Sequence, residues 1–458
     1  MTVCPGLLLE PAIAVSFRRY RAAREERVRE NELTEAAPTA SPEGEPVRIV
    51  YPRCAGIDIH KQSMTVCMIV DSQNGSAPEY HKRKFATHTE GIGELAAWLR
   101  EFQVTDVGME STGVYWKPVW NALEGEWKLH LCNPHHTRAI PGAKTDFRDG
   151  TRVAELLAYG KLPESFIPPQ WQRELRDLTR LRARYTQEVT RIENRIEKVL
   201  EDAQIKLGTV TSKLLGVSGR AMLEALARGE TDVDKLAGLA QRKLKRKKPA
   251  LRQALQGKVT EHHRFQLGML LDDLKHTEEK ITQLELRIWE YVEPHRELVE
   301  RLDQIPGVDW LSAAVILAEI GPDVSHWEDA RKLASWSCLC PGNCLSAGKR
   351  LSGRTRKGNP WLRRAFCQMG WAASHKKNSY TKAQFRRLAG RRGKQRAVLA
   401  VAHTLLTVVY HLIANPDLQY RDLGEDYFDR RNAEQTKKQL VKRLAKLGYE
   451  VTLTPKAA

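Results

Sequence analysis

Residues 54–60 read CAGIDIH, a short apolar run in which Asp58 is flanked by isoleucines. Such a run is typical of a buried β-strand. Similar patterns predict strands at MTVCMIV (64–70), around EYHKRKFAT (79–87), at DVGME (106–110) and at KLHLCN (128–133), with helices over 89–101, around 114–124 and from 146 to about 159. Three strands followed by alternating helix and strand predict a mixed α/β sheet that ends in a helix.

Four acids in this region are notable for their positions. Asp58 ends the first strand, Glu110 ends the fourth, and Asp146 and Asp149 are spaced i, i+3 on one face at the start of the closing helix. If the first and fourth strands are parallel neighbours, the four carboxylates can converge at one edge of the sheet. Taken singly, each acid is also explained as an ordinary strand end or helix N-terminus.

Converging carboxylates repel one another unless cations neutralise them. Oxygen-rich acidic sites suit Mg²⁺, or alternatively Mn²⁺, and two such ions about 4 Å apart promote phosphodiester chemistry. The ordered set of four acids therefore predicts a metal-dependent site that acts on a phosphodiester.

The rest of the chain is predicted to be mostly helical. Two runs have the alternating three- and four-residue spacing of coiled-coil seams, which favours a long antiparallel hairpin or a seam between subunits. Between the runs, RKLKRKKP (242–249) is predicted to be an exposed basic segment. The seam residues are Tyr185, Val189, Ile192, Ile196 and Val199, then Leu267, Leu270, Leu274, Ile281, Leu284, Ile288 and Tyr291, with a polar gap at Thr277.

Composition and punctuation divide the chain into five parts. Residues 1–46 form a flexible extension and linker, 47–165 the sheet domain, 166–300 a helical domain with coiled coil and basic insert, 301–415 a C-terminal domain, and 416–458 a charged helical tail. The C-terminal domain opens with IPGVDWLSAAVILAEIG (305–321), which resembles a helix-hairpin-helix element. The turn of that element can offer backbone N–H groups to phosphate, but Asp309 stands where a second glycine is common, so packing is an equally good explanation.

The charge of the chain points to a polyanionic partner. Of 458 residues, 74 are Lys or Arg and 56 Asp or Glu, which gives a net charge of +18. Residues 330–396 contain many Lys and Arg and no acid at all, and such a distribution favours nucleic acid. The eight scattered cysteines indicate a reducing compartment and no zinc site. No run approaches the roughly 18 apolar residues of a membrane span, so a soluble, cytoplasmic protein is expected.

Several motifs together resemble one known family. AGIDIHK, GMESTGVYW and GAKTDFRD, in this order of strands and helices, resemble the RNase H/RuvC-like domain of the DEDD transposases in the IS-one-ten insertion-sequence family. IPGVDWLSAAVILAEIG and CPGNCLSAGKRLSGRTRKGNPWLRRA resemble the second transposase domain of that family. The resemblance covers about residues 50–410. The departures are the first 46 residues, Gly150 early in the closing helix, and Cys344 and Leu345 before Ser346.

The resemblance implies a function and a set of roles. Asp58, Glu110, Asp146 and Asp149 are implied to be the Mg²⁺-binding catalytic set, with Ser346 as the catalytic serine that forms a phosphoserine. A structured bridge RNA is implied to pair with target and donor DNA, and homodimers or homotetramers to build composite active sites. The basic residues expected to hold nucleic-acid phosphates are Lys349, Arg350, Arg354, Arg356, Lys357, Arg363 and Arg364. The resemblance also implies a bacterial, nucleoid-associated protein.

Two other functions remain open from the residues alone. A structure-specific nuclease of the junction-resolving type uses the acidic domain and water but leaves the second domain without chemistry. A non-enzymatic nucleic-acid-binding protein explains the charge but treats the four placed carboxylates as a coincidence.

Overall fold

The computed structural model describes residues 48–71, 77–111, 113–133, 146–342, 344–346, 349–355 and 357–454, except for the side chains of 146–148, 344–346 and 349–351. The extension predicted over 1–46 lies outside the described residues. The chain divides into two compact units, one ending at Ile167 and the other beginning at Pro168.

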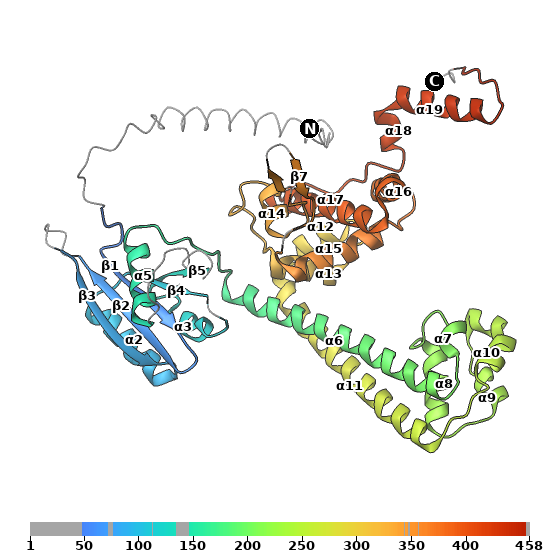
Figure 1. Cartoon of the computed structure of the whole chain (residues 1–458), viewed down its shortest axis with the longest axis horizontal. Coiled ribbons are helices and arrows are strands. Elements are labelled where there is room, and N and C mark those ends of the chain that lie inside the picture. Colours follow the sequence, from blue (N-terminus) through green and yellow to red (C-terminus); the bar gives the residue numbers. More distant parts are fainter. Residues whose placement is uncertain are drawn as a thin grey trace. The chain divides into compact units, whose positions relative to one another are not determined.

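The first unit is built on a five-stranded sheet of order β3-β2-β1-β4-β5 (Figure 1). Its elements are β1 (Arg53–Ile59), β2 (Ser63–Val70), β3 (Glu79–Ala86), α2 (Thr89–Glu101), β4 (Asp106–Glu110), α3 (Trp116–Leu123), β5 (Lys128–Cys132) and α5 (Asp146–Ala158). Strand β1 pairs antiparallel with β2 and parallel with β4, and β4 pairs parallel with β5. The predicted mixed sheet, with its first and fourth strands as parallel neighbours, is confirmed.

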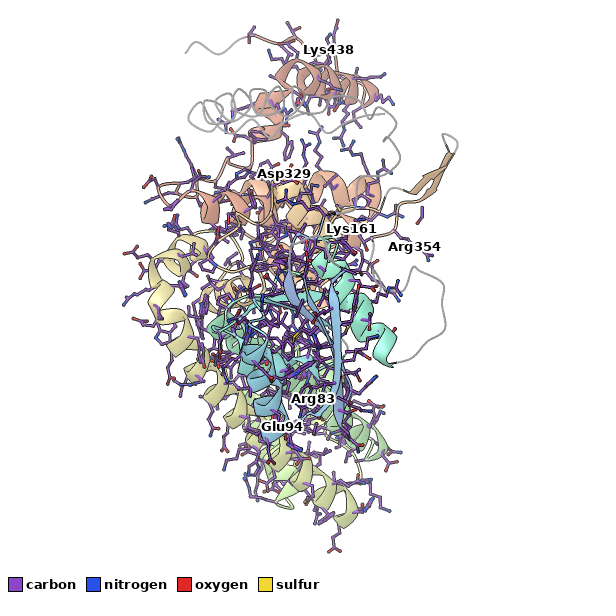
Figure 2. The ribbon with its side chains drawn as sticks, turned by 90° about the vertical axis from the view of Figure 1, so that its left-hand side faces the viewer. Arg83, Glu94, Lys161, Asp329, Arg354 and Lys438 are labelled. Carbon is purple, nitrogen blue, oxygen red and sulfur yellow. The ribbon has the colours of Figure 1, made fainter. Side chains whose placement is uncertain are left out.

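Helices cover both faces of this sheet. On one face, α2 and α3 pack on residues such as Ile57, and an ion pair joins Arg83 of β3 to Glu94 of α2, with Nη2 and Oε2 3.8 Å apart (Figure 2). On the other face, α5 packs through Val153 on the buried cysteines of β1, β2 and β5. Because alternate residues of a strand face opposite sides, the two faces have separate cores.

Two glycines let α5 approach the second face closely. A Cβ atom at Gly56 of β1 would lie 2.2 Å from the backbone nitrogen of Ala154 and 2.4 Å from the carbonyl oxygen of Gly150. A Cβ atom at Gly150 would lie 2.9 Å from the carbonyl oxygen of Thr65 in β2. Gly150 lowers helix propensity, and this backbone contact is the reason that a better helix former does not fit there.

A buried polar network fixes the segment that leaves the sheet. His130 of β5 is 2% exposed, and its Nε2 lies 2.9 Å from Asp106 Oδ1 while its Nδ1 lies 2.6 Å from Glu164 Oε1. The Ser165 backbone N–H also donates to the Leu131 carbonyl over 2.7 Å. The segment before the unit boundary is therefore tied to the outer edge of β5.

The second unit contains a long antiparallel hairpin of α6 (Gln170–Asp202) and α11 (Glu261–Val292) (Figure 1). Near the base of the hairpin, the Tyr291 hydroxyl donates to Glu174 over 2.7 Å, and farther along Arg182 donates to Glu285 over 2.6 Å. The predicted seam therefore closes within one chain. Thr277, the polar gap in the seam, is 7% exposed and donates its hydroxyl to the Asp273 carbonyl of its own helix over 2.7 Å.

The hairpin ends in a small helical tip. The tip contains α7 (Leu207–Val210), α8 (Val217–Ala227), α9 (Val233–Gly238), the 3₁₀ helix η1 (Arg242–Lys247) and α10 (Lys248–Ala254). Met222, Leu223 and Leu251 join the ends of α6 and α11 in one core. Most of the basic side chains of 242–249 are exposed, as predicted.

Eight further helices follow α11 in the described C-terminal part of the chain. They are α12 (Arg296–Asp303, preceded by the 3₁₀ turn η2, Glu293–His295), α13 (Trp310–Glu319), α14 (Ala330–Trp336), α15 (Pro360–Ala373), α16 (Tyr380–Arg392), α17 (Lys394–Ala414), α18 (Tyr427–Arg431) and α19 (Ala433–Lys446). Helices α12 to α15 and α17 share one core with the base of the hairpin. This mostly helical second unit agrees with the predicted fold class.

Helix α17 corrects one expectation. It is 21 residues long with a mean hydropathy of 1.9 in its most apolar window, so by length and composition it could cross a membrane. The expectation that no run is apolar enough for a span is therefore wrong. Isolated polar residues such as His403 and Thr407 interrupt the apolar run in the sequence, but the mean hydropathy of the helix is still high. Of that window, 56% is buried, and α17 packs against α14, α15 and α16 as the central helix of its core.

Candidate active site

Glu110 ends β4, and Asp58 is the last residue but one of the neighbouring parallel strand β1. Strands β1 and β4 pair in register through the residues just before these acids, so the two acids are level with each other and face the same side of the sheet. This is the side that α5 covers, because a Cβ atom at Gly56 or at Gly108, two residues earlier on each strand, would press on α5.

Helix α5 brings its first turn to the same end of the sheet. The Val50 N–H donates to the Ala158 carbonyl over 2.7 Å, so the end of the helix lies beside the chain that enters β1. One helix turn from the start, Gly150 lies against Thr65, which is the cross-strand partner of Asp58. The helix therefore runs antiparallel to β1, and its first turn, with both predicted aspartates, lies near Asp58.

Two of the acids have titratable neighbours among the described residues. Asp58 is 8% exposed, and the exposed ring of His60 places Nε2 3.2 Å from Asp58 Oδ2. Glu110 pairs in register with Cys132, whose pKa is raised to about 12 mainly by burial and further by the Glu110 charge. His60 was not predicted as a site residue, although its position two residues after Asp58 on the same strand face could have indicated it.

The structure brings together the elements that carry the four acids, but not a finished ligand cluster. Asp149 is half-buried, and the side chain of Asp146 lies outside the described residues. Among the side chains that the structure describes, no three His, Cys, Asp or Glu groups lie close enough to hold a metal ion. Carboxylates from three elements at one edge nevertheless supply the oxygen donors that Mg²⁺ or Mn²⁺ prefers, so the residues fit such an ion.

Ser346 lies in a β-hairpin that was not predicted from the sequence. The hairpin consists of β6 (Cys344–Ser346) and β7 (Lys349–Ser352), and Ser346 pairs with Lys349 where the two strands connect. The Gly342 N–H donates to the Arg354 carbonyl over 2.9 Å and extends the pairing at the base. Figures 1 and 2 show the hairpin projecting from the helices of its own unit. The side chain of Ser346 itself lies outside the described residues.

The predicted phosphate-binding residues are described only in part. Arg354 and Lys357 are exposed after the hairpin, Arg364 is exposed on α15, and Arg363 is half-buried there. Among the described residues these four cations have no acidic partner, so their charge is available to an anion. Arg356 and the side chains of Lys349 and Arg350 lie outside the described residues.

The residues of the turn between α12 and α13 pack against α15 and cap α13. Gly307 has φ +81°, and a Cβ atom there would lie 2.5 Å from the Met369 carbonyl of α15. Asp309 caps α13 by accepting a hydrogen bond from the Ser312 N–H over 2.8 Å. A carboxylate at the helix N-terminus repels phosphate, so the structure favours packing over phosphate binding for this element.

Comparison with known protein families covers both units. A model for DEDD transposases of the IS110 type, described as transposase, matches residues 55–205, and a model described as transposase of the IS116/IS110/IS902 family matches residues 299–386. The first span contains all four acids, and the second contains Ser346. The chain belongs to the IS110 family of transposases. The resemblance to the IS-one-ten family that the motifs indicated is thereby confirmed.

Two relatives extend over most of this IS110-family chain. The pilin gene-inverting proteins of Moraxella bovis and Moraxella lacunata are each 23% identical over 375 residues, which cover 78% of this chain and 94% of the relative. The transposase for insertion sequence element IS1111A of Coxiella burnetii is 28% identical over 155 residues, 33% of this chain and 42% of that protein. The IS110-family transposase described here is therefore a DNA recombinase, an enzyme that cuts and rejoins DNA, and DNA is its substrate.

Proposed function

We propose that this transposase exchanges DNA strands through a split active site, in which Asp58, Glu110, Asp146 and Asp149 hold Mg²⁺ and Ser346 is the nucleophile. A structured bridge RNA selects the target and donor DNA by base pairing, and two or more copies of the chain supply the two halves of each site. The observation that supports the proposal is the arrangement of β1, β4 and α5, in which the strand ends that carry Asp58 and Glu110 and the first turn of α5 lie at one edge of a sheet.

The acids have a distinct task in this proposal. When bound, a divalent ion supplies positive charge that stabilises the crowded phosphoryl transition state. Asp58 and Glu110 hold their carboxylates on the α5 face of rigid strands, and the start of α5 is set by the Gly56 contact. The acids can therefore act as preorganised ligands, and their summed negative charge favours the binding of a divalent cation.

The serine conserves the energy of the phosphodiester bond. The Ser346 oxygen attacks phosphorus, the bond from phosphorus to one strand oxygen breaks, and that strand leaves as a free hydroxyl. A hydroxyl of the new strand then attacks the phosphoserine, so that a phosphodiester re-forms and the serine is released. No external energy source is required. The basic residues around the β6–β7 hairpin supply the positive surroundings that the transition state needs.

Base pairing is a suitable way to select sites for a protein with this charge distribution. Exposed cations without acidic partners hold phosphates in any sequence, so they give affinity without base readout. A guide RNA provides the missing selectivity by base pairing, as in other RNA-guided systems. Sequencing of the RNA that co-purifies with the full chain tests this step, because one discrete structured RNA supports guidance and random cellular RNA contradicts it.

A two-plasmid recombination assay tests the serine. We expect Ser346→Ala to abolish strand exchange, while Ser352→Ala, a matched change on the same hairpin, keeps most of it. Full recombination by Ser346→Ala contradicts the assignment. Trapping of a covalent protein–DNA adduct on a nicked substrate gives a readout that does not depend on completed exchange.

Replacement of an acid tests the metal-binding half. We expect Asp58→Asn to remove Mg²⁺-dependent cleavage, because the neutral amide lowers the summed charge at the site. Glu94→Gln, on the opposite face of the sheet, is the control. Unchanged cleavage kinetics of Asp58→Asn across a Mg²⁺ titration would show that Asp58 is not a ligand. Cleavage without any covalent adduct in the unchanged protein would instead favour a nuclease that uses water.

A further inference from the structure

Three arginines surround one tryptophan in the second unit. Trp361 lies in the first turn of α15 and is half-buried. The guanidinium carbons of Arg180 and Arg184, both on α6, are each 5.8 Å from the centre of its ring, and that of Arg364 on α15 is 5.9 Å away. The electron-rich faces of an indole attract cations, but three cations around one ring also repel one another.

Among the residues that the structure describes, only one of these three cations has an acidic partner. Arg180 makes a bidentate pair with Glu319, with Nε 2.8 Å and Nη2 2.9 Å from the two carboxylate oxygens. Glu319 is 1% exposed and also accepts a hydrogen bond from Asn359 Nδ2 over 2.6 Å. The Asn359 Oδ1 in turn accepts from the Trp361 N–H over 3.0 Å. This network fixes the start of α15 against α6 and α13.

The other two cations remain uncompensated. Arg184 and Arg364 are exposed, and no ion pair joins either of them to an acid among the residues that the structure describes. Both guanidinium carbons lie within 6 Å of the same ring centre, so they are less than twice that distance apart. Two guanidinium groups around one ring, with no acidic partner among the described residues, offer concentrated positive charge to an anion, and the planar fork of arginine suits phosphate oxygens.

We propose that Arg184, Arg364 and Trp361 form a phosphate clamp, a site that binds a phosphodiester group of a nucleic-acid strand. The indole holds the two guanidinium groups in place before the strand arrives, which reduces the side-chain entropy lost on binding. The clamp rests on the proposed function, because α15 directly follows the segment that carries Ser346. It adds a contact made jointly by the coiled-coil helix α6 and the C-terminal helices.

Binding measurements on the full chain test the clamp through coupling between its two arginines. Labelled single-stranded DNA, duplex DNA and structured RNA are titrated separately over a range of NaCl concentrations. We expect Arg184→Gln and Arg364→Gln each to weaken binding about tenfold and to lower the salt slope by about one. The double variant should bind only slightly more weakly than either single variant, because both changes remove the same phosphate contact. The strand type that shows this coupling identifies the occupant.

A third arginine serves as the matched control. Arg392 is exposed on α16 and lies outside the clamp, so the effect of Arg392→Gln should multiply with that of Arg184→Gln instead of saturating. Trp361→Leu should weaken binding severalfold, and Trp361→Phe should restore most of it, with thermal unfolding confirming that each variant is folded. The proposal is wrong if, for every strand type, the losses of affinity caused by Arg184→Gln and Arg364→Gln multiply in the double variant, as those of the control pair do. It is also wrong if Trp361→Leu binds unchanged.

Failure of the clamp and failure of the proposed function can be told apart. Strand binding requires no chemistry, so these titrations can be performed with Ser346→Ala. The recombination and adduct assays alone show whether Ser346 has a catalytic role, whereas the binding titrations alone show whether the clamp exists.

Discussion

Replacement of Gly150 by alanine tests whether the close contact between α5 and the sheet sets the position of the acids. The new Cβ atom would lie 2.9 Å from the Thr65 carbonyl oxygen, whereas ordinary van der Waals contact begins at 3.4 Å. The start of α5 must therefore move by about 0.5 Å. Asp149 directly precedes Gly150, so this carboxylate moves with the helix.

Gly150→Ala changes the stability through two opposing contributions, whereas it should only lower the cleavage activity. Alanine gains about 1 kcal/mol in helix propensity over glycine, and overpacking costs about 1–3 kcal/mol. The free energy of unfolding should thus fall by no more than about 2 kcal/mol. A displacement of about 1 Å in a catalytic group can cost about a hundredfold in rate. For half that displacement we expect about a tenfold loss in the Mg²⁺-dependent cleavage rate.

Gly93 provides the matched comparison within the same unit. It is exposed in α2, and a Cβ atom there would meet nothing within 4 Å. Gly93→Ala should therefore raise the free energy of unfolding by about 0.5–1 kcal/mol and leave cleavage unchanged. Urea unfolding and single-turnover cleavage of supercoiled DNA measure both quantities. If Gly150→Ala is as stable and as active as Gly93→Ala, α5 does not depend on a glycine contact.

Further predictions concern the core of each unit. Gly56→Ala places a Cβ atom 2.2 Å from a backbone nitrogen of α5, so it should cost about 3 kcal/mol or more; a smaller loss in urea unfolding would argue against the tight approach. His130→Asn should cost about 1–3 kcal/mol in the same assay, because it removes the buried histidine partner of Asp106 and leaves that carboxylate only Thr105 and Lys128, and a near-neutral change would show that this network is unimportant. Thr277→Val should raise the free energy of unfolding in urea by about 0.5–1 kcal/mol, because the described hydrogen bond of the buried hydroxyl is to its own helix. A lower free energy of unfolding would mean that the hydroxyl stabilises the seam. The Cys132 thiol, with its pKa raised to about 12 by burial, should be neutral and resist iodoacetamide at neutral pH in the folded protein, and rapid labelling detected by mass spectrometry would contradict this.

The sequence predicted those elements whose signals are local. The boundaries of α2 agree with the predicted helix 89–101, because this segment has a strong apolar period and the His88 side chain caps its start. The five strands were recognised because apolar runs with β-branched residues are interrupted by turn residues. The parallel pairing of β1 and β4 followed from element order, and the placement of Asp58 and Glu110 followed from that pairing.

Features that depend on distant contacts were not predicted. Gly150 looked like a departure from helix preference until the Thr65 carbonyl was found against it. The β6–β7 hairpin is too short and too basic to show an alternating pattern. The pair between Arg180 and Glu319 joins residues 139 positions apart, and no periodicity reports a contact of that kind. Arg180 and Arg184 beside Trp361 were not predicted for the same reason, whereas Arg364 was expected to hold a phosphate.

The length of the α6–α11 hairpin also sets the distance between its base and its tip. At about 1.5 Å per residue, its 33-residue first helix spans about 50 Å. The base belongs to one hydrophobic core and the far end to another, and the seam joins the two helices between these cores. Insertion of seven residues into each helix would keep the seam in register and move the tip outward by about 10 Å. The distance from base to tip thus depends on the number of heptads in the seam. Whole heptads can be added or removed without a change in either core.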